Sequence, residues 1–307
     1  MKREKLTVIV PVYNDAECIP IFLSHLIPIC DQIKGKYETD VVFLNNCSTD
    51  QTHVVISQII KTHPNVYEIT MSKNVGYQKS IECGLRNSEG DLFVVIDVDG
   101  EDPPFMIMEF LQKYEEGYDL VYGIRSDRVE SRIMKKARKM FYKVTKAVAD
   151  EEIILYMAEF SLFNNAVKTA IVDSSDSFPF LRSSLARVGF DRFGISYKRE
   201  KRYAGETNYN LRKIFIFAVA SLLSSTTLPL RIPVYAFLPF LIFNCIFGLN
   251  LFNQETISNV LTLLVGNFLY FGFSICSISL YLARTYKNGL GVPNSYINFR
   301  KSKLQKS

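Results

Sequence analysis

The stretch "FVVIDVDGEDPPF", residues 93–105, places four acidic side chains in six positions directly after an apolar run. The run has the length and composition of a buried strand, and two prolines then break the chain. Asp97 and Asp99 stand two positions apart, so their side chains share a face wherever the chain stays extended. Two carboxylates with open positions beside them suit Mg²⁺ or Mn²⁺, although such a pair alone is weak evidence. We predict a metal and phosphate site at Asp97 and Asp99.

Asp102 comes directly before Pro103 and Pro104. An aspartate at this place is typical of a helix N-cap, and proline is well tolerated in the first turn that follows. The sequence therefore predicts a helix over residues 103–117, with Asp102 in a mainly structural role.

Apolar runs of strand length recur in the N-terminal half, with helical patterns between them. This alternation is typical of βαβ units, which form a mostly parallel sheet with helices on both faces. Ligands of such sheets bind at the carboxyl ends of the strands, and polar residues follow the predicted strands there. We therefore predict an α/β fold with a ligand site along one sheet edge. The predicted strands cover residues 6–13, 40–46, 66–72, 91–99 and 119–125.

Two charge-free apolar stretches lie in the last third of the chain, at residues 234–252 and 260–283. Each reaches roughly 30 Å as a helix, which matches the hydrocarbon thickness of a bilayer. Two buried core helices are the alternative, but two such stretches side by side are rare in soluble folds. We predict a transmembrane hairpin within residues 231–283, preceded by an amphipathic juxtamembrane segment at 208–230.

The charges around the hairpin predict its orientation. The connector at 253–259 has no Lys or Arg, whereas the tail at 284–307 has six basic residues and no acidic one. By the positive-inside rule the tail is cytoplasmic, and a hairpin returns the chain to the side of the N-terminal domain, residues 1–207. The opening residues lack the long apolar run of a signal peptide. These features predict a multi-pass membrane protein whose N-terminal domain lies in the cytoplasm.

The composition argues against several other classes of protein. The chain has 307 residues, of which 48% are hydrophobic, and its net charge of +5 does not imply a nucleic acid partner. Six scattered cysteines without a paired spacing argue against a zinc site or a disulfide framework. No Gly-rich phosphate loop and no G-x-S-x-G motif occur. The three histidines are predicted to be surface or packing residues.

Two amphipathic patterns, at residues 131–148 and 209–225, precede the hairpin. In the first, apolar residues recur at helical spacing and seven Lys and Arg residues supply the other face. The pattern fits a solvated surface helix, and it also fits a helix that lies against anionic lipid headgroups.

Seven short motifs follow one another in the chain: "VIVPVYND", "NNCSTDQT", "SKNVGYQKS", "VVIDVDGEDPP", "GYDLVYGIRSDR", "MAEFSLFNN" and "REKRYAGETNYNLRKI". In this order they resemble glycosyltransferase family 2, in particular its polyprenyl-phosphate branch with the bactoprenol glucosyltransferases. The motifs and the hairpin extend the resemblance over nearly the whole chain. It implies a GT-A fold and an inverting transfer of a sugar, with a UDP-sugar as the expected donor, to polyprenyl (undecaprenyl) phosphate for cell-surface glycan modification.

The resemblance also assigns residues to the donor. A divalent cofactor, Mg²⁺ or Mn²⁺, would be held by Asp97 and Asp99 beside the diphosphate. The residues implied for the base, ribose, diphosphate and sugar are Pro11, Tyr13, Asp15, Asn46, Ser48, Lys73, Asp97 and Glu101.

On the acceptor side, the resemblance implies that Glu159 acts in catalysis together with Asp99. Arginine pairs bidentately with phosphate oxygens, which suits an acceptor phosphate. The implied partners are a nucleoside-diphosphate sugar, a polyprenyl phosphate lipid, the membrane and further copies of the chain in a homo-oligomer. The residues implied for the acceptor phosphate are Arg202, Thr207, Tyr209 and Arg212.

The chain departs from the family pattern in three places. Relatives usually show two aspartates and a glycine in the second motif, a glutamine in the fourth, and "GDFR" where this chain has "AEFS". The residues at these places are Asn45, Asn46, Cys47, Glu101, Glu159 and Ser161. Because a phosphomonoester is mostly dianionic at pH 7, its transfer does not depend on a strong base. We predict that Glu159 positions the acceptor or accepts a residual proton.

Two alternatives differ from transfer to a lipid phosphate. A processive polysaccharide synthase of the same superfamily would carry a Q-x-x-R-W motif, whereas this chain has no tryptophan. A non-catalytic membrane scaffold has no physical need for a carboxylate pair and phosphate-binding arginines together.

Overall fold

The computed structural model describes residues 3–127, 140, 154, 157–174, 179–204, 226–253 and 257–305. The predicted amphipathic segments at 131–148, apart from Met140, and at 209–225 lie outside the described residues. Three predicted acceptor residues lie outside them as well: Thr207, Tyr209 and Arg212.

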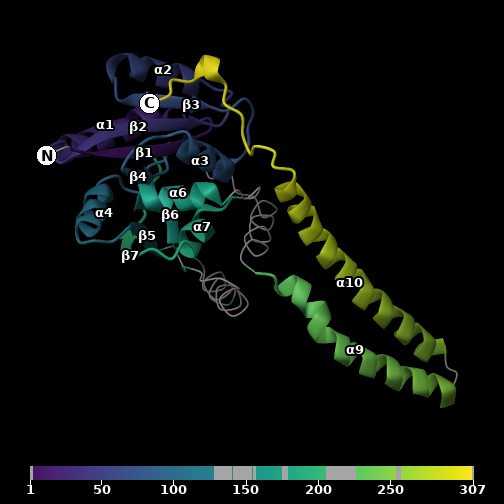
Figure 1. The fold of residues 1–307 in the computed structure, drawn as a ribbon. Coiled ribbons are helices and arrows are strands. Elements are labelled where there is room, and N and C mark those ends of the chain that lie inside the picture. Colours follow the sequence, from purple (N-terminus) through teal and green to yellow (C-terminus); the bar gives the residue numbers. More distant parts are fainter. Residues whose placement is uncertain are drawn as a thin grey trace.

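A seven-stranded sheet forms the centre of the N-terminal domain, with the strand order β3-β2-β1-β4-β6-β5-β7 (Figure 1). β6 runs antiparallel to both of its neighbours, and every other pair of neighbours is parallel. Strands form at all five predicted places, and β6 and β7 add to them, but β4 ends at Val95, so the predicted extension of this strand to Asp97 and Asp99 is wrong. The bounds are β1 Glu4–Val12, β2 Tyr37–Asn45, β3 Val66–Thr70, β4 Leu92–Val95, β5 Leu120–Asp127, β6 Met157–Asn164 and β7 Arg192–Lys198.

Helices cover both faces of this sheet. Buried side chains of α1, α2 and α4 belong to one apolar cluster, and those of α3, α6 and α7 belong to a second cluster on the opposite face. The predicted arrangement of a mostly parallel sheet between two helical layers is therefore confirmed. The bounds are α1 Cys18–Ile33, α2 Thr52–Thr62, α3 Tyr77–Arg86, α4 Met106–Glu115, α6 Asn165–Asp173 and α7 Leu181–Arg187.

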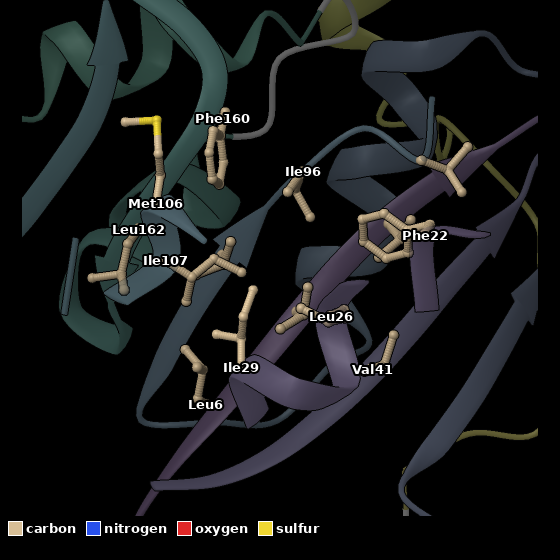
Figure 2. Close-up of a cluster of buried hydrophobic side chains, with 14 of the residues drawn as sticks. Leu6, Phe22, Leu26, Ile29, Val41, Ile96, Met106, Ile107, Phe160 and Leu162 are labelled. Carbon is tan, nitrogen blue, oxygen red and sulfur yellow. The ribbon is translucent and has the colours of Figure 1, made fainter. Parts of the chain in front are cut away.

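The alternation of side chains along β1 explains why both faces need a helical layer. Val8 and Val10 belong to the cluster beneath α1 and α4, whereas Ile9 belongs to the opposite cluster. All three are at most 1% exposed. Figure 2 shows the first cluster, in which Leu26 of α1 and Ile107 of α4 gather over the strands. A strand that is buried on both sides is mostly apolar, and this explains the apolar run from Leu6 to Val12, which only Thr7 interrupts.

β4 is short, and the acidic residues follow closely after its end. Val95 and Ser161 are the last residue pair between β4 and β6. Asp97 follows two residues after Val95, and Glu159 precedes Ser161 by two residues on the neighbouring strand. The acidic pair and the predicted catalytic glutamate therefore follow from adjacent strands at one edge of the sheet.

Two long apolar helices, α9 Leu228–Asn253 and α10 Ile257–Gly289, project together away from the sheet (Figure 1). The candidate membrane spans within them are Leu228–Leu249 and Ile257–Gly289, and hardly any of their residues is buried. The alternative of two buried core helices is therefore wrong. An amide hydrogen bond of 2.8 Å from Asn267 to Asn244 joins the helices within the apolar stretch. Such interhelical bonds are a common feature of membrane-spanning helices.

The C-terminal tail, residues 290–305, returns from α10 to the sheet domain and pairs with the edge strand β3 (Figure 1). Glu68 and Lys303 exchange two backbone hydrogen bonds of 3.0 and 2.8 Å. The Gln305 side chain donates a hydrogen bond of 2.7 Å to Asp40. The tail thus covers backbone groups of an edge strand and fastens the end of α10 to the sheet domain.

Ending the chain at Gly289 is expected to lower the stability of the sheet domain by about 2–4 kcal/mol. The reason is that β3 and the residues after it lose four backbone hydrogen bonds to the tail. Thermal unfolding of the purified protein in detergent measures the effect. A chain that ends at Gln305 keeps every described contact of the tail and serves as the control. Equal unfolding midpoints of the two chains would contradict a stabilising role for the tail.

Candidate active site

Four acidic side chains follow β4, and we call them the carboxylate cluster: Asp97, Asp99, Glu101 and Asp102. Guanidinium groups from two other segments form ion pairs with three of them. Arg125 belongs to β5, whereas Arg199 and Arg202 lie in the segment after β7. Burying carboxylates is costly unless they are paired, so these arginines are what allows the cluster to form.

Asp97 is the residue of the carboxylate cluster whose pKa is shifted most. Tyr77, the first residue of α3, donates a hydrogen bond of 2.5 Å to Asp97 Oδ1. Burial, followed by the negative charges of Asp102 and Asp99, raises the pKa of Asp97 to about 7. Burial and the charges of Asp97 and Glu159 also raise the pKa of Tyr77 well above its ordinary value. A cation placed beside Asp97 would favour its charged form.

Arg202 and Arg199 pair with the next two carboxylates. Arg202 Nη2 lies 2.7 Å from Asp99 Oδ2, and Arg199 Nη1 lies 2.6 Å from Glu101 Oε2. Asp99 Oδ1 also accepts a hydrogen bond of 3.0 Å from the backbone N–H of Glu101. Arg202, which was predicted to bind the acceptor phosphate, therefore lies at the carboxylate cluster. Arg199 is a site residue that the sequence analysis missed.

Backbone hydrogen bonds hold this pairing in register. The N–H of Glu200 donates to the carbonyl of Glu101 at 3.0 Å, and the N–H of Tyr203 donates to that of Asp99 at 2.9 Å. Gly100, between the two carbonyls, has a φ of +81°, and a Cβ atom there would collide with the Tyr203 ring. The turn therefore requires glycine at this position.

Asp102 does not cap a helix, so that prediction is wrong. α4 begins at Met106, and its N-cap residue is Phe105. Asp102 is 1% exposed and accepts hydrogen bonds from Arg125, at 2.9 Å, and from the hydroxyl of Tyr197. The carboxylate turns inward because a buried guanidinium is a stronger partner than the N–H groups of a solvated helix end.

The loops after β1 and β2, where nucleoside contacts are predicted, are joined to each other. Asn14 Oδ1 accepts a hydrogen bond of 2.8 Å from the N–H of Thr49, and the N–H of Asn14 donates to Ser48 Oγ at 3.1 Å. Tyr13 is 44% exposed on this pair of loops. Pro11 is buried within β1 below them. The predicted residues of this side thus occupy one continuous rim of the sheet edge.

Asp15 connects this rim with the carboxylate cluster. Its carboxylate accepts a hydrogen bond of 2.8 Å from the N–H of Tyr13, and its own N–H donates to Thr52 Oγ1 at 3.0 Å. Burial raises the pKa of Asp15 above its ordinary value, and the negative charge of Asp99 adds to the shift. The two carboxylates are therefore close enough to influence each other.

The amide groups of Asn45 and Asn46 are used inside the fold. Asn45 donates a hydrogen bond of 2.9 Å to the buried Glu68. Asn46 donates to Asn74 at 3.1 Å and accepts from the N–H of Val75 at 2.8 Å. Asn46 therefore fixes the loop after β3, whereas its predicted contact with base or ribose stays a prediction.

Lys73 is exposed on that loop, residues 72–76, which leads directly into α3. The first residue of α3, Tyr77, donates to Asp97, so Lys73 belongs to the same edge of the sheet. Its approach to a diphosphate stays a prediction. Cys47, after β2, has a φ of +60°, a conformation that the glycine of the family pattern adopts at lower cost.

Glu159 is buried on β6, with 4% of its surface exposed. Arg182 Nε, from α7, donates to Glu159 Oε1 at 2.8 Å, and Gln78 Nε2, from α3, donates to the same oxygen at 2.9 Å. The hydroxyl of Ser161 donates to the backbone carbonyl of Glu159 at 3.0 Å. Neither Arg182 nor Gln78 was found from the sequence, because no local pattern links α3, β6 and α7.

The described side chains do not form a complete metal site on their own. Within the described ranges, no group of three His, Cys, Asp or Glu residues could hold a metal ion. Asp97 and Asp99 offer two carboxylates, and the raised pKa of Asp97 shows that it would gain from a nearby cation. The residues present therefore fit a divalent ion that takes its other ligands from a substrate and from water.

A mostly parallel sheet with one antiparallel inner strand, and with acidic residues where its fourth strand ends, is the arrangement of a GT-A glycosyltransferase. The chain belongs to glycosyl transferase family 2, whose family model matches residues 7–189. The resemblance found in the motifs is confirmed, and the protein is a glycosyltransferase with two apolar C-terminal helices that could span a membrane.

Curated relatives support this family assignment. The uncharacterized glycosyltransferase YkcC of Bacillus subtilis (strain 168) is 30% identical over 289 residues, which cover 91% of this chain and 89% of that protein. The prophage bactoprenol glucosyl transferase homolog of Escherichia coli (strain K12) is 32% identical, and the match covers 75% of each chain. The Mn²⁺, UDP and phosphoglyceric acid complex of glucosyl-3-phosphoglycerate synthase from Mycobacterium tuberculosis is more distant. It gives a TM-score of 0.49 at 17% identity, over 72% of this chain and 78% of that one.

Proposed function

We propose that this glycosyltransferase transfers a sugar from a nucleoside-diphosphate sugar, with UDP as the nucleotide, to polyprenyl (undecaprenyl) phosphate. The observation that carries the proposal is that one chain combines a charged site at the sheet edge with two exposed apolar helices. Relatives that are named bactoprenol glucosyl transferases support a lipid acceptor. The product would be a lipid-linked sugar for the modification of cell-surface glycans.

The donor would lie along the rim formed by the loops after β1, β2 and β3. Tyr13 is exposed there and would contact the base, while Asp15 and Ser48 lie beside it in the two joined loops. Lys73 would approach the diphosphate from the third loop. Asn46 acts on the donor indirectly in this proposal, because its amide already holds the loop that carries Lys73.

A divalent ion, Mg²⁺ or Mn²⁺, would bind Asp97 and Asp99. When bound, such an ion stabilises the negative charge that develops on a leaving nucleoside diphosphate. Arg202 is already 2.7 Å from Asp99 and would add a second positive charge at that place. We therefore assign Arg202 to the donor diphosphate rather than to the acceptor. Glu101, held by Arg199, would lie near the donor sugar.

The proposed reaction forms one bond and breaks one bond. An oxygen of the acceptor phosphate attacks the anomeric carbon of the sugar, and the bond between that carbon and the nucleoside diphosphate breaks with inversion. Most of the acceptor is dianionic at pH 7, so only a minor protonated fraction has a proton to lose. Glu159, on the strand beside Asp97, would receive that proton or align the acceptor. Thr207, Tyr209 and Arg212 stay proposed acceptor residues.

The arrangement of the chain supports a cytoplasmic active site at a bacterial inner membrane. The tail after α10 is paired with β3, so tail and catalytic domain lie on the same side of any membrane that α9 and α10 cross. The basic residues of the tail favour the cytoplasmic side. A homo-oligomer remains part of the proposal.

One experiment tests donor and acceptor together. The purified full-length chain is incubated with undecaprenyl phosphate, Mn²⁺ and a panel of labelled nucleotide sugars, with undecaprenol as the matched acceptor that lacks the phosphate. We expect label in the lipid fraction from a UDP-sugar, and only with the phosphorylated acceptor. No labelled lipid from any donor, or equal labelling of undecaprenol, would contradict the proposal.

The raised pKa of Asp97 predicts a pH-dependent response to metal. Because the folded-state pKa lies above the unfolded value, Asp97 favours folding at low pH and loses this contribution as pH rises from about 4 to about 7. Without divalent metal, Asp97→Asn should therefore melt above the wild type at pH 8. Mn²⁺ should raise the wild-type melting midpoint more at pH 8 than at pH 6, since protons compete with the ion. An equal Mn²⁺ response of wild type and variant would contradict metal binding at Asp97.

A further inference from the structure

The two oxygens of Glu159 have unequal surroundings. Oε1 accepts both side-chain hydrogen bonds, one from Arg182 and one from Gln78. Oε2 is buried, and no hydrogen-bond donor in the described part of the chain reaches it. A buried oxygen without a partner costs about 1–3 kcal/mol, so this arrangement is unfavourable unless a ligand supplies the missing hydrogen bond.

The donors to Oε1 are themselves fixed in place. Gln78 Oε1 accepts a hydrogen bond of 2.9 Å from the N–H of Leu181, the first residue of α7. This bond ties α3 to α7 next to the arginine. Burial lowers the pKa of Arg182 and the adjacent Glu159 charge raises it, with a net upward shift, so the guanidinium stays charged. Glu159 is thus held by a positive charge and an amide, both of which act on one oxygen.

The position of Glu159 places the unpartnered oxygen at the reaction site. Gln78, which donates to Glu159, is the neighbour in α3 of Tyr77, which donates to Asp97, and Glu159 lies on β6, the strand next to β4. Asp97 and Asp99 already supply negative charge here. A further carboxylate oxygen is therefore tolerated best against a group that donates hydrogen, such as a hydroxyl of the sugar or a protonated phosphate oxygen.

We propose that Arg182 is a positioning residue for Glu159: together with Gln78 it holds Oε1, and so leaves Oε2 as the single oxygen that meets a hydrogen-donating group of the substrate. This inference rests on the proposed function and adds to it the residue that orients the glutamate. Ser161, two residues along β6, cannot supply a cation to this carboxylate. Arg182 supplies that cation from a helix that is distant in sequence.

The test compares Arg182→Met, Arg182→Lys, Glu159→Gln and the double variant Arg182→Met/Glu159→Gln in the labelled-lipid assay. We expect kcat to fall by about 100-fold in Arg182→Met, since a displaced catalytic group of this kind costs that much, while KM for the donor stays nearly constant. Arg182→Lys keeps the charge and should recover part of kcat. In the Glu159→Gln background, Arg182→Met should change kcat by no more than about 2-fold, because it then has no carboxylate to position.

Arg187, exposed at the end of the same helix, provides the matched control as Arg187→Met. Melting midpoints of all variants separate a loss of fold from a loss of positioning, and Arg182→Lys serves if Arg182→Met does not fold. The inference would be overturned if folded Arg182→Met kept the full kcat. It would also be overturned if the kcat losses of the two single variants multiplied in the double variant. In both cases the proposed function would stand. No transfer by the wild type would overturn the proposed function itself.

Discussion

The Asp99→Asn variant is expected to lose sugar transfer by about 100-fold to 1,000-fold in kcat, the range found when one stabilising group of a developing charge is removed. Asp99 is at once a proposed metal ligand and the partner of Arg202, 2.7 Å away. An asparagine can still accept the hydrogen bond from the N–H of Glu101, so the turn is kept while the negative charge is lost. Initial rates of lipid labelling at saturating donor and Mn²⁺ measure the effect.

The control for this variant is Glu109→Gln, which removes a carboxylate from the exposed side of α4 and should leave kcat unchanged. The melting midpoint of Asp99→Asn should stay near that of the wild type, since Arg202 keeps a second carboxylate, Glu101, at 3.4 Å. Undiminished transfer by a folded Asp99→Asn protein would rule out a role for this carboxylate in the reaction.

The Arg125→Met variant is expected to destabilise the protein by about 3–5 kcal/mol, the usual cost of removing one partner of a buried ion pair. The side chains of Arg125 and Asp102 are 12% and 1% exposed. Without the guanidinium, Asp102 would lose its ion pair of 2.9 Å, and it would keep the hydrogen bond from Tyr197 and a longer contact of 3.7 Å with Arg199 Nε. Chemical or thermal unfolding of the purified protein measures the loss.

Two further variants make this prediction specific. Asp102→Asn/Arg125→Met removes both charges and should recover most of the lost stability, because no unpaired carboxylate remains. Lys34→Met breaks an exposed pair with Asp31 and should cost no more than about 1 kcal/mol. Equal effects of Lys34→Met and Arg125→Met would contradict the account of Asp102 as a buried, charge-paired residue.

The elements of the fold that follow from periodic patterns could be predicted from the sequence. The apolar runs at 6–13 and 40–46 became β1 and β2, and the charge-free stretches became α9 and α10. β6 was not predicted, although it carries Glu159, because Glu159 and Ser161 interrupt its apolar residues and no continuous apolar run marks the strand. The antiparallel direction of β6 has no local signal, since it depends on the path of the chain between strands.

The candidate site was predictable in its position but not in its contacts. The acidic residues after β4 were found because they follow a strand whose carboxyl end faces the ligand edge. The partner of Asp102 was not predicted, because the residues next to it are typical of a helix N-cap, whereas its side chain turns inward to Arg125, which is distant in sequence. Arg202 was found as a motif residue, yet only the fold shows that it pairs with Asp99.

The sequence by itself determined the α/β class, the order of the family motifs, the two apolar helices and the acidic residues after β4. These features depend on neighbouring residues and on the short spacing of apolar positions, so they can be recognised before the path of the folded chain is known. Only the tertiary structure decided which charges pair, that Arg182 from α7 holds Glu159, and that the C-terminal tail lies on β3. Such contacts join segments that are far apart in the chain. They form because a buried charged side chain is stable only beside a partner of opposite charge, and no local sequence pattern shows which partner that is.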